Sequence, residues 1–196
     1  MMAGHPNNAD PTSLRNLPFA IFMGGKDSAY NRNTVAQNWG DRLKKLQAAD
    51  PEGYPHRCTI YEGLGHWMDG RDAEGLPWMA QYTRDPWPTK VVWKQSGRTH
   101  ARFAWLSTES PNSTKGKTIT AEVDGQTIRI TKDPLMPYTL RLSDALVDLD
   151  QPIEIVVNGT PFLRGQVHRT EAAIRQSLAE RFDPASVATV LVDLPF

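Results

Sequence analysis

Two short apolar runs, each followed within two residues by glycine, flank a helix-length segment in the first part of the chain. The first run is Leu17 to Met23 and the second is Arg57 to Tyr61. Runs of this kind are typical of strands buried in a parallel sheet. Parallel neighbours require a crossover connection, which a helix between them supplies with right-handed geometry. The pattern therefore predicts a βαβ unit.

The segment between the two runs has the spacing of an amphipathic helix. From Tyr30 onward, apolar residues recur at intervals of three and four, and charged residues fall on the opposite face. The stretch from Asp50 to Pro55 contains two prolines and a glycine, which end the helix. A second helix is expected within Asp69 to Thr83. The predicted apolar face of the first helix consists of Val35, Trp39, Leu43 and Leu46.

A carboxylate and an imidazole follow the two predicted strands. Asp27 comes after the glycines that close the first run, and His66 comes after two glycines beyond the second. Because the carboxyl ends of parallel strands meet at one edge of a sheet, we expect the two side chains to lie close together. A carboxylate that holds an imidazole in one tautomer is typical of acid–base catalysis. Taken alone, Asp27 is equally well interpreted as a helix cap, and His66 as a loop residue.

The motifs around these two residues resemble those of a known fold family. Gly24-Gly25-Lys26-Asp27 and Gly63-Leu64-Gly65-His66-Trp67, with the helix between them, are similar to the C-terminal part of an α/β-hydrolase. The likeness is to the esterase, polyhydroxyalkanoate-depolymerase and dienelactone-hydrolase-like group, and it extends to about Trp87. It implies an α/β fold in which a short parallel sheet with helices represents the C-terminal half of the hydrolase.

The resemblance also implies roles for four residues. Asp27 matches the acid of a Ser…Asp…His triad, and His66 matches its base. Trp67 and Trp78 resemble the aromatic residues that border the substrate cleft, although packing of a helix on the sheet explains them equally well. The expected substrate is a small or polymeric carboxylic ester, and the resemblance implies no cofactor.

The chain departs from this family at the nucleophile. It contains no Gly-x-Ser-x-Gly motif and no oxyanion-hole segment, so the acid–base pair has no serine to activate. The run Met1 to Pro6 resembles the end of the strand that precedes the acid-bearing one. We therefore expect a truncated relative of a serine hydrolase that is inactive alone and begins partway through the parent domain.

Beyond the proline-containing segment Arg84 to Pro88, the hydrophobic period changes to two. Asp124-Gly125 and Asn158-Gly159 each separate alternating runs, which is a strong hairpin signal. Thr170 is a good N-cap for a helix at 170–182, with an expected apolar face of Ala173, Ile174, Leu178 and Phe182. The sequence thus predicts two domains: a hydrolase part at 1–87, and an antiparallel β-sheet or sandwich with one helix at 88–196.

Five further segments of the second part are predicted to form strands. They are Val91 to Lys94, Arg102 to Leu106, Tyr138 to Leu142, Pro152 to Val157 and Val187 to Leu194. An alternative function for the chain follows from this part: a non-catalytic binding or interaction protein that contacts a polymer or partner through aromatic side chains. Those aromatic residues are Trp93, Trp105 and Tyr138.

Composition and charge exclude several classes of partner and site. The 22 basic and 22 acidic residues balance, which gives no electrostatic reason to expect nucleic acid or an anionic membrane surface. No apolar stretch approaches the roughly 20 residues of a membrane helix, and we expect no signal peptide. The single Cys58 is predicted to be a packed core thiol. No cluster of histidines or cysteines has metal-ligand spacing, so no metal site is assigned.

A parallel sheet of two or three strands has an unpaired edge. Such an edge presents free backbone donors and acceptors, and proteins normally cover it. We expect either a homodimer formed through this sheet edge or packing of the β-rich domain across it.

Overall fold

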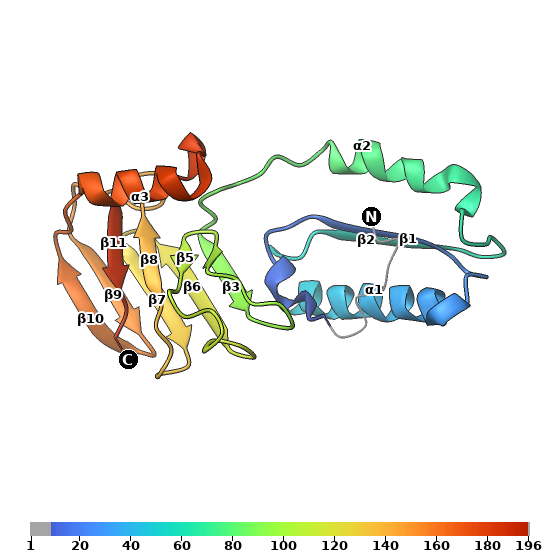
Figure 1. Ribbon diagram of the computed structural model, residues 1–196, viewed down its shortest axis with the longest axis horizontal. Helices are drawn as coiled ribbons and strands as arrows, with labels where there is room; N and C mark the ends of the chain where they lie inside the picture. The colour runs from blue at the N-terminus through green and yellow to red at the C-terminus, as the bar shows by residue number, and fades with distance from the viewer. Residues whose placement is uncertain (1–8, 196) are drawn as a thin grey trace. The chain divides into compact units, whose positions relative to one another are not determined.

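The computed structural model describes residues 9–195, and the expectation for Met1 to Pro6 lies outside them. The chain divides into two compact units, Met1–Arg84 and Asp85–Phe196. The division falls inside the proline-containing segment predicted as a linker. The content is mixed α/β, with one parallel sheet in the first unit and two further sheets in the second (Figure 1).

The first unit is built on two parallel strands joined by a long helix. Strands β1 (Phe19–Gly24) and β2 (His56–Tyr61) pair in register from Phe19 opposite His56 to Gly24 opposite Tyr61. Helix α1 (Arg32–Ala49) lies between them in the sequence. This confirms the predicted pair of parallel strands joined by a helix, with two strands among the described residues.

Helices cover both faces of this strand pair (Figure 1). On one face, Ile21 and Met23 of β1 pack against the buried side of α1, where Trp39 and Leu43 lie. On the other face, Phe22 contacts α2 (Gly75–Met79) so closely that a Cβ atom on Gly75 would lie 2.9 Å from the phenyl ring. The apolar face predicted for α1 is confirmed, since Val35 and Leu46 also pack on this cluster.

The helix predicted within Asp69 to Thr83 is confirmed, but its α-helical part is only the short α2, which begins at Gly75. A 3₁₀ helix, η3 (Met68–Glu74), contains left-handed backbone at Asp69 and Gly70 and leads into the short α2. Left-handed residues interrupt the i to i−4 hydrogen-bond ladder, so a continuous α-helix does not form. Pro77 is tolerated in α2 because it lies in the first turn, where backbone N–H groups have no intrahelical partner. Shorter 3₁₀ helices are η1 (Pro11–Leu14), η2 (Ala29–Asn31) and η4 (Pro184–Ser186).

The second unit contains a five-stranded and a four-stranded sheet. Their strand orders are β10-β9-β7-β6-β3 and β11-β8-β5-β4. The purely antiparallel arrangement predicted for this part is wrong, because β7 and β9 run parallel. Strand β8, which lies between them in the sequence, belongs to the other sheet, so the chain returns to the first sheet in the same direction. The bounds are β3 (Lys90–Lys94), β4 (Arg102–Phe103), β5 (Leu106–Ser107), β6 (Thr118–Asp124), β7 (Thr127–Lys132), β8 (Thr139–Leu142), β9 (Ile153–Val157), β10 (Thr160–Gly165) and β11 (Val190–Asp193).

The two predicted hairpins form at the predicted glycines. Strands β6 and β7 pair up to Asp124 opposite Thr127, which leaves a two-residue loop with Gly125 at a φ of 56°. Between β9 and β10, Asn158 and Gly159 both have positive φ, as a type I′ turn requires. The side chain of Asn158 also bonds both the N–H and the C=O of Lys132, which attaches this turn to the end of β7.

One apolar cluster draws on both sheets of the second unit. It includes Ile119 and Ile155 from the five-stranded sheet and Leu106 and Leu140 from the four-stranded sheet. The three aromatic residues offered by the sequence for partner binding are buried in this same core, so a binding surface made of them is wrong. They are Trp93, Trp105 and Tyr138.

Two local predictions for this unit also differ from the structure. The strand expected from Arg102 to Leu106 is interrupted by Ala104, whose φ of 48° separates β4 from β5. Helix α3 (Glu171–Arg181) is capped by Thr170 as predicted, but its expected apolar face is confirmed only at Ala173 and, half-buried, at Ile174. Ala173 and Ser177 are buried, whereas Leu178 is exposed and Phe182 is 85% exposed.

Candidate functional site

The loops that follow β1 and β2 interlock at one end of the parallel pair. Gly25 N–H donates to the carbonyl of Tyr61 at 2.9 Å, and Lys26 N–H donates to that of Leu64 at 2.9 Å. A Cβ atom on Gly24 would lie 2.0 Å from the Gly65 carbonyl oxygen. Any side chain at position 24 would therefore force the two loops apart. The glycines that close the first apolar run are required by this approach of one backbone to the other.

Asp27 and His66 face each other across these loops. Oδ2 of Asp27 lies 2.7 Å from Nδ1 of His66. An ionised carboxylate only accepts hydrogen bonds, so Nδ1 carries the proton and donates it. The Asp27 side chain is 4% exposed, while that of His66 is 39% exposed. Within residues 9–195, no group bonds the remaining ring nitrogen, Nε2, which leaves it free to accept a proton from a ligand.

Arg32 and Asn33 hold the carboxylate side of the pair in place. Nη1 of Arg32 lies 3.3 Å from Oδ1 of Asp27. Asn33 donates from its backbone N–H to the Asp27 carbonyl and from its side-chain amide to the Gly25 carbonyl. Burial raises the pKa of Asp27, but the hydrogen bond from His66 and the charge of Arg32 outweigh it and leave the pKa below its usual value. Asp27 is therefore ionised at neutral pH.

Asp27 does not serve as the cap of the following helix. The N-cap of α1 is Asn31, which has left-handed backbone and makes no side-chain capping bond. Both carboxylate oxygens of Asp27 are instead bonded to side chains, one to His66 and one to Arg32. The sequence left two interpretations of Asp27 open, a helix cap and a partner for the imidazole. The structure shows the second.

Arg32 was not among the residues singled out from the sequence. The signal available for it is weak: a basic residue five positions after Asp27, at the start of the predicted helix. Basic residues are common at such positions, and periodicity does not show which way the side chain turns. The left-handed backbone of Tyr30 and Asn31 turns the chain before α1 and carries Arg32 back toward Asp27.

The structure places the two predicted tryptophans differently. Trp67 is 82% exposed and its ring meets that of His66 edge-on, with 5.0 Å between centroids and 76° between planes. Trp78 lies on α2, is half-buried and packs against Tyr82 with ring centroids 4.9 Å apart. Only Trp67 is thus brought into contact with the imidazole by a ring interaction.

Cys58, the single cysteine of the chain, lies apart from the Asp27–His66 pair. Cys58 is a free, partly buried thiol on β2, and its side chain packs against Gly40 of α1. Burial raises its pKa, with a further contribution from Asp41, which keeps it protonated and unreactive.

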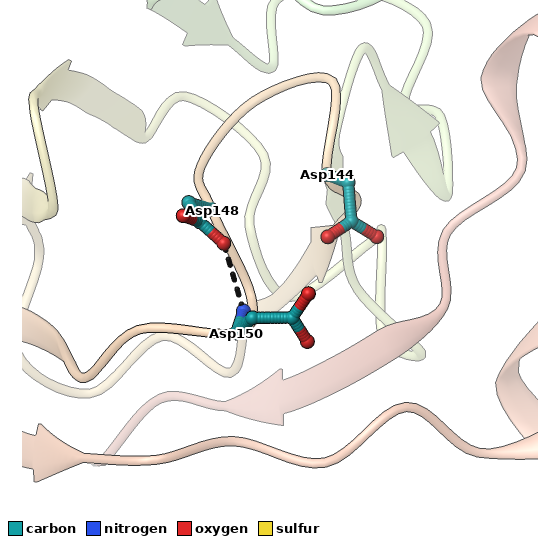
Figure 2. A group of neighbouring side chains, drawn as sticks. All are labelled: Asp144, Asp148 and Asp150. Atoms are coloured by element: carbon teal, nitrogen blue, oxygen red, sulfur yellow. Dashed lines mark hydrogen bonds between the residues drawn. The ribbon is translucent and has the colours of Figure 1, made fainter.

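Figure 2 shows an acidic group in the second unit, formed by Asp144, Asp148 and Asp150. Arg169 forms ion pairs with Asp144 and Asp150. The third carboxylate, that of Asp148, accepts a hydrogen bond from the backbone N–H of Asp150. Arg169 thus neutralises two of the three carboxylates.

Comparisons with known proteins add no family assignment: no family model, curated protein or solved structure matches this chain. Among residues 9–195, every helix is too short or too polar to cross a lipid bilayer.

The approach of the two loops predicts that Gly24→Ala is destabilising. The added methyl group overlaps the Gly65 carbonyl, and we expect a loss of about 1–3 kcal/mol in the free energy of unfolding. Gly65→Ala is the matched control, because a Cβ atom there meets nothing within 4 Å. Urea denaturation of both variants measures the effect, and equal stability of the two would contradict the proposed contact.

The lowered pKa of Asp27 predicts how its contribution to stability varies with pH. Such a group stabilises the fold above its unfolded-state pKa of about 3.9, and the contribution is lost as the pH falls through the lower native value. We expect Asp27→Asn to be less stable than wild type at pH 7, with the difference shrinking below about pH 4. Urea titrations at a series of pH values measure both quantities.

Asp124→Asn serves as the control for this titration, because Asp124 is exposed on the β6–β7 hairpin. It should remain close to wild type at every pH. A stability difference for Asp27→Asn that stays constant down to pH 2 would show that the carboxylate charge contributes nothing.

Proposed function

We propose that this chain contributes the acid and the base of a carboxylic-ester hydrolase of the serine type, whose nucleophile lies outside these 196 residues. The observation that carries the proposal is the 2.7 Å hydrogen bond between Asp27 and Nδ1 of His66. It leaves Nε2, the nitrogen that must take the serine proton, without a partner among the described residues. This is the orientation that the imidazole of a Ser-His-Asp triad requires.

The location of the pair supports an α/β-hydrolase origin. Asp27 and His66 lie just beyond the carboxyl ends of adjacent parallel strands, and one helix separates the strands in the sequence. That position and order are those of the last two triad members in this fold. On this proposal, the first unit corresponds to the C-terminal half of such a hydrolase.

In the reaction proposed, each residue has a separate task. Nε2 of His66 removes the hydroxyl proton as the serine oxygen attacks the ester carbonyl carbon. The imidazolium then gives that proton to the departing alcohol, which leaves an acyl-enzyme. Water, deprotonated by the same nitrogen, then attacks the acyl carbon; the bond to the serine oxygen breaks, the imidazolium returns its proton to that oxygen, and the carboxylic acid is released. Asp27 keeps Nδ1 protonated and stabilises the imidazolium that forms twice in this cycle.

Two neighbours would assist these steps. Arg32 keeps Asp27 ionised, so the carboxylate remains an acceptor throughout the cycle. Trp67 is exposed and lies against the ring of His66. It therefore offers a flat apolar surface beside the base, where an acyl or alcohol group can rest. Trp78, packed against Tyr82 on α2, is the weaker candidate for contact with substrate.

The unpaired edges of the strand pair lead to a second part of the proposal. Among the described residues, β1 and β2 pair only with each other. We propose that one of these edges is covered in a homodimer of this chain, because free edge groups promote association.

The enzyme proposal is tested by extending the expressed chain through the in-frame codons upstream of Met1. We expect this extension to encode further strands and a Gly-x-Ser-x-Gly motif, and the longer protein to hydrolyse short acyl esters. His66→Gln and Asp27→Asn should each lower its kcat by about 10⁴-fold. The 196-residue chain itself should show no turnover that depends on His66.

His56→Gln is the matched control, because His56 lies on β2 and bonds the carbonyl of Tyr54 rather than Asp27. This variant should keep full activity. Upstream stop codons, or unchanged kcat in the His66→Gln form of the extended protein, would refute the proposal.

The dimer is tested by sedimentation equilibrium of the 196-residue chain over a range of concentrations. We expect a mass twice that of one chain, with dissociation on dilution because a two-stranded edge contact is small. A monodisperse monomer at all concentrations would contradict the edge contact.

A further inference from the structure

The second unit contains a polar cavity on the outer face of its four-stranded sheet. Its volume is about 550 Å³, within the range of small-molecule sites. Leu106 and Leu140 point from β5 and β8 into the core, so the residues on either side of them in each strand point outward. The outward residues that line the cavity are Arg102, Ser107, Thr139, Arg141, Leu191 and Asp193.

Helix α3 supplies the facing wall. Ser177 anchors it to the chain before β11 by bonding the N–H and the carbonyl of Ala188. Ser177 and Ala173 are the buried residues of the helix, and the polar residues next to Ser177 face the cavity. Gln176, Glu180 and Arg181 therefore line the cavity.

Positive charge at one end of the cavity is only partly neutralised. Glu180 lies 3.1 Å from Nη1 of Arg102 and 2.9 Å from Nη2 of Arg141, so one carboxylate serves two guanidinium groups. Burial, together with repulsion from Arg141 and Arg181, lowers the pKa of Arg102 to about 10. A second anion at this end would relieve that repulsion.

Arg141 also has a hydrogen-bond donor without a partner. Its side chain is 1% exposed, and its Nη2 group donates to Ser177 at 2.8 Å. Its Nε atom is buried and bonds nothing within the described chain. Buried donors in folded proteins are nearly always satisfied, and leaving one unpaired costs about 1–3 kcal/mol. Because this Nε–H is also closed to solvent, an oxyanion in the cavity bonds it only after a neighbouring group moves aside.

The opposite end of the cavity has a different chemistry. A row of register partners leads from Arg102 at the positive end through Ser107 and Thr139 to Asp193, and its first and last strands lie about 14 Å apart at about 4.8 Å per strand. Thr139 donates its hydroxyl to Asp193 at 2.6 Å. Hydroxyl and carboxylate groups at this end accept hydrogen bonds from a ligand, whereas the guanidinium end binds negative charge.

We propose that this cavity binds a small organic anion that bears hydroxyl groups, with its phosphate or carboxylate at Arg102 and Arg141 and its hydroxyls toward Thr139 and Asp193. The ligand is the size of a sugar phosphate or a sugar acid. This site does not depend on the hydrolase proposal, since every residue in it belongs to the second unit.

The proposal is tested on the ¹⁵N-labelled 196-residue chain with three probes: glucose 6-phosphate, gluconate and glucose. We expect saturable shifts of the Arg141 Nε–Hε resonance with at least one anionic probe, at a Kd of about 1 mM or tighter. The titrations with glucose 6-phosphate and gluconate identify whether a phosphate or a carboxylate is preferred. Glucose, which has no charge, should bind at least tenfold more weakly than the better of these two anions. Equal binding of glucose, or no saturable shift with either anion, overturns the proposal.

Variants separate ligand binding from a purely structural ion pair. Arg102→Gln and Arg181→Gln should each weaken binding of the anionic probe at least threefold. Because Arg181 is exposed, its replacement leaves the packing of α3 on the sheet unchanged. Thr139→Val should weaken binding of glucose 6-phosphate but not of inorganic phosphate. Arg169→Gln is the matched control, because Arg169 pairs with Asp144 and Asp150 outside this cavity. Equal affinity in the Arg181→Gln and Arg169→Gln forms would show that positive charge in the cavity does not attract the anion, which overturns the proposal.

Discussion

The hydrogen bond between Asp27 and His66 is the interaction on which the candidate site depends, and it exists because two backbones approach without side chains between them. Gly24 leaves no room for a Cβ atom beside the Gly65 carbonyl. The backbone bonds of Gly25 and Lys26 to the second loop fix this approach. The geometry of the Asp27–His66 pair is thus determined first by glycine and main-chain contacts, and only then by the two side chains themselves.

The two units use arginine against carboxylate in opposite ways. In the first, Arg32 supports a buried carboxylate that already has a partner in His66, so Asp27 remains ionised. In the second, the single carboxylate of Glu180 pairs with both Arg102 and Arg141. Burying a charged group without a full set of partners costs free energy, because a low-dielectric surrounding solvates the charge poorly. The first arrangement suits proton transfer by an adjacent base, whereas the second suits the binding of an added anion.

Local signals predicted the elements whose formation depends on neighbouring residues. The glycines at 125 and 159 specify their hairpins through positive φ, and the spacing of Trp39 and Leu43 specifies the buried face of α1. Two features depended on distant contacts and were mispredicted. The parallel pairing of β7 with β9 arises because β8 enters another sheet, and Ser177 of α3 is buried where it bonds the backbone of Ala188.

The sequence by itself determined that a carboxylate and an imidazole follow successive strands, because strand, turn and helix propensities act over a few residues. It did not determine which partner Asp27 would choose, since capping of α1 and pairing with His66 are both compatible with its position. Only the tertiary structure decided this, through the loop contact at Gly24 and the return of Arg32. The burial of Trp93 and Trp105 was likewise decided there, because alternation defines two faces of a strand but only the packing of two sheets determines which one is inside.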